Sequence, residues 1–194
     1  MPNWCDNSLT IEGSSENALR IMEAFRSNNP FSKIHPCPQE LYDDEAHSYG
    51  GTDEASARRD ARRAELKAKY GYESAYDWQC GEWGTKWDVD PDAYDEGPTS
   101  MSVTFDSAWS PPIELYRWIN RNYPEVRLEW TYAEGGVGFQ GEGWCEGDVF
   151  DDVTSDYQYE DDEEETLLII DEMTYATPNV GAATVLPLPG GNNK

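Results

Sequence analysis

The order of two hydrophobic periodicities constrains the fold of this chain more than any other feature. Apolar side chains recur at every second residue in segments 5–11, 83–89, 101–105 and 126–132, as they do in half-buried strands. They recur at helical spacing in segments 18–25 and 115–119. The resulting order is strand, helix, strand, strand, helix, strand. We therefore predict an α+β fold of the ferredoxin-like βαββαβ type, an antiparallel sheet with two helices on one face.

Local signals set the expected ends of these elements. Ser14 or Ser15 is expected to cap the first helix, and Ser110 the second, with Pro111 in its first turn. The run from residue 90 to residue 98 has turn chemistry and is expected to join the second and third strands. The glycine-rich stretch 135–147 can return as a further edge strand.

Two further segments lie outside this core pattern. Residues 52–70 carry a narrow alanine stripe and favourable ion pairs one helical turn apart, which predicts a surface helix inserted into the domain. Residues 151–165 are dominated by acids and predict a solvated segment, although Thr166–Ile170 has the composition of an extra strand. We thus expect a domain at residues 1–150 and an acidic extension at residues 151–194, partly disordered or docked as a strand.

The charge of the chain is strongly negative and unevenly distributed. The formal net charge is −25, and after Arg127 the sequence holds sixteen Asp and Glu and a single basic residue, Lys194. Such a surface favours basic partners, for example proteins that grip nucleic acid, and disfavours nucleic acid itself. No apolar run is long enough to span a membrane and the N-terminus has no export signal, so we expect a cytoplasmic protein.

Four sequence blocks resemble a known family. They are residues 1–7 (Met-Pro-Asn-Trp-Cys-Asp-Asn), 83–88 (Trp-Gly-Thr-Lys-Trp-Asp), 108–112 (Ala-Trp-Ser-Pro-Pro) and 138–141 (Gly-Phe-Gln-Gly). Together they resemble the YubB ferredoxin-like domain family. The resemblance implies a ferredoxin-like fold in a small protein carried by phages, plasmids or genomic islands. It implies no catalytic residues, and it does not extend to the acidic segment after about residue 150.

The motifs of common enzyme classes are absent from the sequence or incomplete. Residues 136–141 match G-x-G-x-x-G, but no helical pattern follows to receive a pyrophosphate. Asp88, Asp90 and Asp92 begin like a calcium loop that lacks the required glycine and final glutamate. Neither histidine lies in a catalytic motif. We therefore predict no enzyme activity, no catalytic residues and no cofactor.

The cysteines leave one metal hypothesis open. Cys5, Cys37, Cys80 and Cys145 show no CxxC spacing, which favours reduced thiols. A composite site would require the fold to bring His35 and Cys37 together with Cys5 or Cys80. The sequence does not decide this point, and our prediction contains no metal site.

We predict a non-enzymatic accessory protein of a phage or mobile element that inhibits a host nucleic-acid-binding or defence protein through an acidic surface. An extended strand over 151–165 carries about a third of the charge density of duplex DNA, so a folded face must contribute more carboxylates. Acids such as Asp88, Asp90, Asp92, Asp95, Glu142, Glu146 and Asp148 are available for this. The predicted partner-binding residues are Asp151, Asp152, Asp156, Glu160, Asp161, Asp162, Glu163, Glu164 and Glu165.

The alternative hypothesis is a nucleic-acid-binding module that uses the sheet and the basic helix. Its phosphate-binding residues would be Arg58, Arg59, Arg62, Arg63, Lys67 and Lys69. The simpler interpretation of this helix is a surface element that pairs with the chain's own acids.

Overall fold

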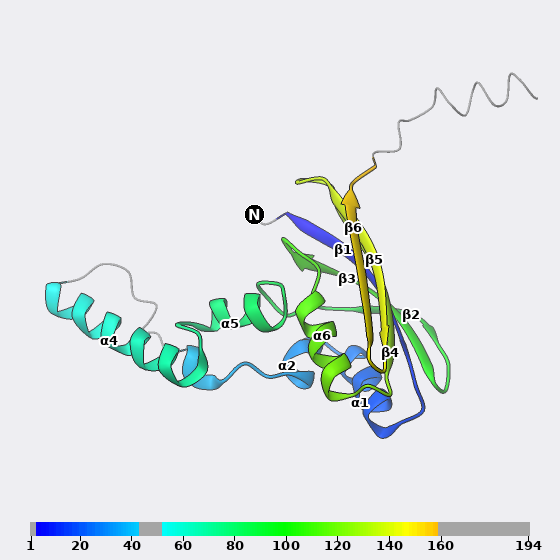
Figure 1. Ribbon diagram of the computed structural model, residues 1–194, viewed down its shortest axis with the longest axis horizontal. Helices are drawn as coiled ribbons and strands as arrows, with labels where there is room; N and C mark the ends of the chain where they lie inside the picture. Colours follow the sequence, from blue (N-terminus) through cyan, green and yellow to red (C-terminus); the bar gives the residue numbers. More distant parts are fainter. Residues whose placement is uncertain (1–2, 43–51, 159–194) are drawn as a thin grey trace, which may run out of the picture. The chain divides into compact units, whose positions relative to one another are not determined.

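The computed structural model describes residues 3–42 and 52–158, except the side chains of residues 93 and 94. Its centre is one antiparallel sheet of six strands in the order β2-β3-β1-β4-β5-β6 (Figure 1). The strands are β1 (Trp4–Glu12), β2 (Asp92–Glu96), β3 (Ser100–Ala108), β4 (Arg127–Glu134), β5 (Phe139–Glu146) and β6 (Val149–Asp156). None of the helices in these ranges is long and apolar enough to cross a membrane.

The ferredoxin-like prediction is confirmed. Strands β2, β3, β1 and β4 lie in the order of a βαββαβ unit, and helices α1 (Glu16–Phe25) and α6 (Ile113–Asn122) connect them. Strands β5 and β6 extend the sheet beyond β4 as two successive hairpins. The predicted glycine-rich edge strand is therefore present as β5, but β6 covers it and forms the actual edge.

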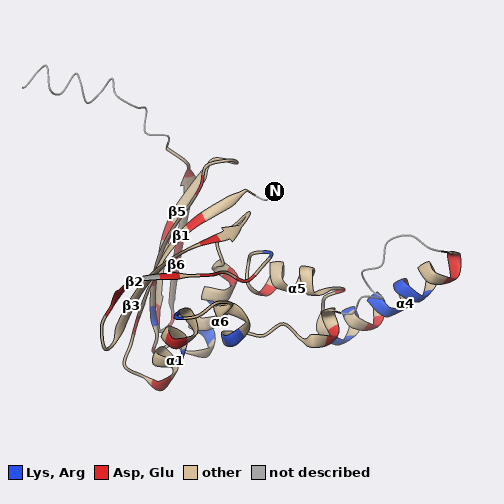
Figure 2. Cartoon of the chain, turned by 180° about the vertical axis from the view of Figure 1, so that it is seen from behind, with Lys and Arg blue, Asp and Glu red and all other residues tan. Residues whose placement is uncertain are grey.

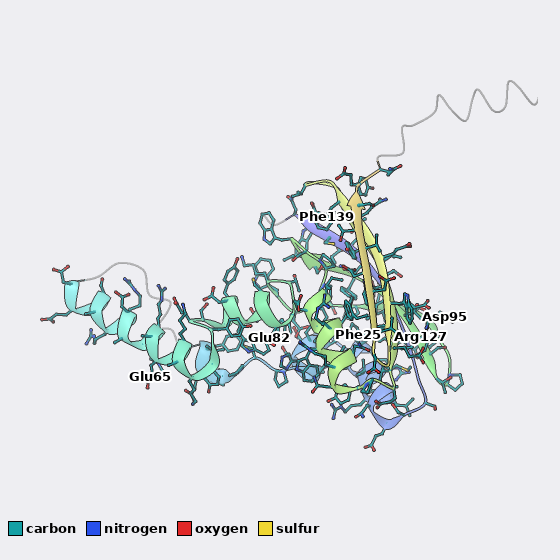
Figure 3. All side chains as sticks on the ribbon, in the orientation of Figure 1. Phe25, Glu65, Glu82, Asp95, Arg127 and Phe139 are labelled. Carbon is teal, nitrogen blue, oxygen red and sulfur yellow. The ribbon has the colours of Figure 1, made fainter. Side chains whose placement is uncertain are left out.

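The hydrophobic core lies between the sheet and its helices. Every second residue of β1, from Cys5 to Ile11, is buried on the helical side, as are Leu128, Trp130 and Tyr132 of β4. Phe25, labelled in Figure 3, lies at the end of α1, and its ring packs against Phe31 and Phe105. The two helices and one sheet face therefore account for most of the apolar burial, which dominates folding stability.

The helix caps agree with the prediction in one case and differ in the other. Ser15 accepts a hydrogen bond from the Ala18 amide and begins α1. The residue before α6 is Pro112, which makes no side-chain cap, so the predicted cap at Ser110 is wrong. The Ser110 hydroxyl instead donates to the Gly84 carbonyl at 2.6 Å and joins two loops.

The predicted strand at residues 83–89 is also wrong. Helix α5 (Ala75–Glu82) ends where that strand was expected to begin, and β2 lies at residues 92–96, inside the predicted turn. Gly84 has φ +87°, which interrupts an extended chain, and the Asp88 carboxylate accepts from the amides of Phe31 and Ser32. The alternating apolar residues gave a wrong strand prediction because Trp83 and Val89 are buried by helices and loops and not by a neighbouring strand.

The remaining helices form the insertion between α1 and β2. Helix α2 (Pro30–Ile34) and the 3-10 helix η1 (Gln39–Tyr42) precede α4 (Asp53–Tyr70), which matches the predicted insertion at residues 52–70. Thr52 caps α4, and Gly71 ends it in the left-handed conformation that glycine adopts most easily. Leu66 is its one buried residue within the described chain, so α4 is largely a surface helix.

The sheet continues past the expected boundary at residue 150. Residues 151–156 belong to β6, which pairs with β5 from Val149 opposite Glu146 to Asp156 opposite Phe139. The first acids after residue 150 are therefore part of the folded sheet and not of a solvated segment. Residues 159–194, including the candidate strand at 166–170, lie outside the described residues.

Trp83 provides a test of the core. Its indole is fully buried, contacts Phe31 and Trp78, and donates to the His35 carbonyl at 2.9 Å. We expect Trp83→Ala to lower the free energy of unfolding by about 3–5 kcal/mol in urea denaturation, because it leaves a large cavity. The exposed α1 control Leu19→Ala should change it by less than about 0.5 kcal/mol, and equal effects would contradict this packing.

Candidate protein-binding surface

The sheet has one face that the described helices do not cover, here called the open face. On each strand it carries the residues that alternate with the buried ones, such as Asp6, Ser8 and Thr10 between Cys5, Asn7 and Leu9. Strand register aligns these positions across the sheet, so Ser8 lies beside Thr104 and Thr131, and Thr131 lies beside Glu142. The open face is therefore mainly polar, although Val149 and Val153 of β6 add exposed apolar side chains to it.

Carboxylates dominate the charged residues of the open face. Figure 2 shows acidic segments on most of the strands, whereas the basic segments lie chiefly on helices. In the described chain, register places nine acids and one cation, Arg127, on this face. The acids are Asp6, Glu12, Asp92, Asp95, Asp106, Glu129, Glu142, Glu146 and Asp151.

Arg127 makes one end of the open face less negative than the rest. Its guanidinium lies within 3.6 Å of Glu12 and 3.2 Å of Glu146, also pairs with Glu129, and covers the Trp144 ring at 5.0 Å. Figure 3 labels Arg127 on the strands, near one end of the sheet. Charge at this end is therefore partly neutralised. In the described ranges, Asp6, Asp106, Glu142 and Asp151 form no ion pair with Lys or Arg, so the negative potential is concentrated away from Arg127.

Two acids of the open face interact with each other: Asp6 and Asp106 lie directly opposite on β1 and β3. Partial burial raises the pKa of Asp106, and a hydrogen bond and charge repulsion from Asp6 raise it further. A hollow of about 810 Å³ lies over these residues and is also lined by Asp90, Asp92, Gln140 and Glu142. All the charged residues that line the hollow are acids, so it suits a cationic group.

A second feature is a group of exposed aromatic side chains beside the first residues of β1, here called the aromatic patch: Trp4, Tyr76, Trp87 and Trp109. Their exposed fractions are 50%, 51%, 42% and 49%. The rings of Trp4 and Trp87 have centroids 6.4 Å apart, and Lys86 lies 4.3 Å from the Trp87 centroid and 5.6 Å from that of Tyr76. Exposed aromatic groups of this kind are typical of interaction surfaces.

The aromatic patch is built by segments that are distant in sequence. The buried Thr85 hydroxyl donates to the Ala108 carbonyl at 2.8 Å, and the Trp109 amide donates to the Asn3 carbonyl at 3.0 Å. Trp109 has φ +74°, a strained conformation for a residue other than glycine. Three of the four sequence blocks that carry the family resemblance thus meet here, and their hydrogen bonds hold Trp109 in a conformation that it does not favour.

The structure separates the predicted partner-binding acids. Asp151 lies on the open face, opposite Trp144, whereas Asp152 lies on the other face and accepts from the Trp130 indole at 2.9 Å. Asp156 shares the face of Asp152 by alternation along β6. The acids at 160–165 lie outside the described residues. These predicted residues therefore do not form one surface within the described chain, and Asp152 has a structural role.

Sequence analysis missed Asp6, Glu12, Asp106 and Glu129 as surface residues of a common face. The signal was available in part, because Asp6 and Glu129 alternate with apolar residues in predicted strands, and Glu12 and Asp106 directly follow two of these strands. Of the supplementary acids proposed from sequence, Asp92, Asp95, Glu142 and Glu146 lie on the open face. Asp88 instead binds the N-terminus of α2.

The basic residues of α4 are engaged with neighbouring acids. Arg62 pairs with Glu65 at 2.8 Å, Lys67 with Glu73 at 2.8 Å, and Lys69 with Glu40 at 2.7 Å. Arg59 lies 3.6 Å from Asp60, and Arg58 and Arg63 also interact with other groups. The alternative phosphate-binding set is therefore at least partly neutralised by the chain itself.

His35 and the cysteines do not form a metal centre in the described residues, where no group of three or more Cys, His, Asp or Glu side chains is placed to hold an ion. The His35 ring stacks on Trp118 at 4.2 Å and lies 3.3 Å from Glu82. Burial lowers its pKa, although Glu82 opposes this shift. Cys5 and Cys145 are buried in the core, where desolvation raises the thiol pKa to about 12 and about 11, so neither is a reactive thiolate.

The family comparison supports the fold class. A family model described as a ferredoxin-like domain in Api92-like protein matches residues 82–171. A crystal structure of a protein api92 from Yersinia pseudotuberculosis is 12% identical, with a TM-score of 0.48, over 82% of this chain and 99% of that chain. No curated protein matches the chain. These comparisons name Api92-like proteins, so the resemblance to the YubB family stays a prediction.

The pair Asp6–Asp106 predicts a pH-dependent stability. Because the pKa of Asp106 is higher in the folded than in the unfolded chain, its ionisation destabilises the fold as pH rises through that range. Asp106→Asn should therefore raise the free energy of unfolding at pH 7, and the gain should vanish below the ordinary carboxyl pKa of about 3.9. Urea denaturation at several pH values tests this. A variant less stable than the wild type at pH 7 would contradict it, and Asp95→Asn is the control on the same face.

Proposed function

We propose that this chain is a non-enzymatic binding protein whose open face captures a basic, nucleic-acid-binding protein. The observation that carries the proposal is the gathering of nine carboxylates on the helix-free face of the sheet, against one guanidinium. Opposite potentials across an interface accelerate association and select partners by charge. A rigid sheet also holds the carboxylates at fixed spacings, which reduces the entropy lost on binding.

The charge density of the open face supports this partner class. Nine acids and one arginine leave a net charge of about −8 along a strand length of roughly 30 Å, or about one charge per 4 Å. Duplex DNA carries one charge per about 1.7 Å of its axis. The face thus reaches roughly half of the DNA value, whereas the acidic segment considered alone from its sequence reaches a third. At the open face, a DNA-binding protein would therefore meet a negative charge density of the same order as that of DNA.

The acids at 160–165 follow β6 in the sequence and would add charge to the same partner. In the setting that the family resemblance implies, a phage or mobile element in a host cytoplasm, the partner would be a host defence protein and the outcome its inhibition. The phage or mobile-element setting and the inhibition of a defence protein are both part of the proposal.

Direct nucleic-acid binding is the less favoured function. The open face repels phosphates, and the cations of α4 pair with Glu40, Glu65 and Glu73. We expect no gel shift of single-stranded DNA or RNA at low salt. A tight complex that is lost when Arg58, Arg62 and Lys67 are changed to Gln would replace the present proposal with this alternative.

A charge-neutralised open face tests the proposal. We expect the variant Asp6→Asn, Asp106→Asn, Glu142→Gln, Asp151→Asn to bind a lysine peptide of about ten residues roughly tenfold more weakly. The reason is that several exposed charge contacts, each worth about 0.2–1 kcal/mol, are removed together. Isothermal titration calorimetry at low and physiological salt measures the affinity and its salt dependence.

The matched control removes four acids from the helical side: Glu16→Gln, Glu23→Gln, Glu114→Gln and Glu125→Gln. Both variants have the same net charge, so a general charge effect weakens binding equally in both. Only a loss confined to the open-face variant supports the proposal. Equal losses in the two variants, or none in either, would overturn it.

A further inference from the structure

We propose that the aromatic patch binds guanidinium groups of the partner, so that the surface selects arginine over lysine. This inference rests on the proposed function, because it names the side chain that the captured partner presents. It concerns a different set of residues, namely Trp4, Tyr76, Trp87 and Trp109 in place of the open-face acids. The two ideas can therefore fail separately.

The exposure of these rings supports a binding role. Each leaves between 42% and 51% of its surface in water, whereas Trp78, Trp83 and Trp130 are at least 95% buried in the same domain. Indole faces carry negative electrostatic potential and attract cations, most strongly for tryptophan. Tryptophan, tyrosine and arginine are also the residues that most often dominate binding energy at protein interfaces.

The patch already holds one cation against its rings. Lys86 Nζ lies over the ring of Trp87, at 4.3 Å from its centroid, and within 5.6 Å of the Tyr76 centroid. This internal contact shows that the Trp87 ring attracts a positive group. Lys86 covers part of that ring, and the four aromatic residues still leave 42% to 51% of their surface exposed. The chain's net charge of −25 favours further cations here and opposes phosphates or other anions.

The patch is continuous with the acidic open face. Trp4 is two residues before Asp6 on β1, so both side chains point to the same face. Asp6 faces Asp106 across β1 and β3, and Trp4 faces Ala108 in the same register. One partner segment can thus place a guanidinium on carboxylates and another on an indole, about two strand residues, or roughly 7 Å, apart.

Arginine fits this combination better than lysine. Its planar guanidinium stacks on aromatic rings and donates two parallel hydrogen bonds to a carboxylate, whereas the lysine ammonium is a compact, strongly hydrated charge. The acids alone attract both cations by charge. A preference for arginine would therefore arise from stacking on the rings and from the geometry of the carboxylates, and not from net charge.

The test compares an arginine peptide and a lysine peptide, each of about ten residues, by calorimetry on the full chain. We expect the wild type to bind the arginine peptide about three- to tenfold more tightly. The double variant Trp4→Leu, Trp87→Leu should lower this ratio clearly, to the smaller preference that the carboxylates alone give, while leaving the affinity for the lysine peptide nearly unchanged. Thermal denaturation checks that the variant folds, and Trp109→Leu provides a second, independent variant.

The control is Trp144→Leu, which removes an indole from the open face whose ring is already covered by Arg127. Its ratio should stay at the wild-type value. A wild-type ratio near one, or a ratio that survives both tryptophan variants, would overturn the inference. Neither of these outcomes requires the lysine peptide to bind weakly, so the proposed function would still stand. If binding of both peptides is lost only in the open-face variant, that result supports the proposed function independently of the aromatic patch.

A variant of Lys86 tests whether the group that binds the aromatic patch is a cation. Replacing it by methionine uncovers the Trp87 ring, so we expect Lys86→Met to raise the arginine-peptide affinity about twofold or more, and the arginine-to-lysine ratio with it. If the patch instead bound bases and phosphates, Lys86→Met would weaken binding of a single-stranded oligonucleotide. Measurable oligonucleotide binding that is lost in this variant would contradict a guanidinium site.

Discussion

The structure depends on a sheet that is buried on one face only. Helices α1 and α6 cover one face, and strand pleating then sends every alternate residue of six strands to the opposite face. Burial requires Leu9, Val103 and Leu128 to be apolar, and it places no such demand on Ser8, Thr104 or Arg127. The core thus requires alternate residues of each strand to be apolar. The residues between them are not constrained in this way, and they form the surface that carries the proposed function.

The connection between α5 and β2 is the second constraint. Trp83 is buried in the helical layer, Thr85 and Ser110 tie the loop to the chain after β3, and Asp88 binds the start of α2. These contacts place Trp87 against Trp4 and hold Trp109 in its strained conformation. A single loop thereby joins the core to the aromatic patch, so loss of its anchors would affect stability and binding together.

Most of the sheet and both of its principal helices could be predicted from hydrophobic spacing. The errors arose where tertiary contacts replaced local signals. Trp83 and Val89 alternate as in a strand, but helices and loops bury them, and Ser110 has the chemistry of a helix cap but bonds to Gly84. The acidic surface was predicted in part: Asp151 and four of the supplementary acids lie on the open face. Asp6 and Asp106 were not considered, and Asp152 instead accepts a hydrogen bond from Trp130.

The sequence by itself determined the periodicities, the helical insertion and the excess of negative charge, because each of these follows from residues close together in the chain. The tertiary structure alone decided which acids share a face, since strand register joins Asp6 to Asp106 across a hundred residues and places Asp151 opposite Trp144. It also brought Trp4, Trp87 and Trp109 to one place. Pairing between distant strands sets these neighbours, and no local spacing encodes it.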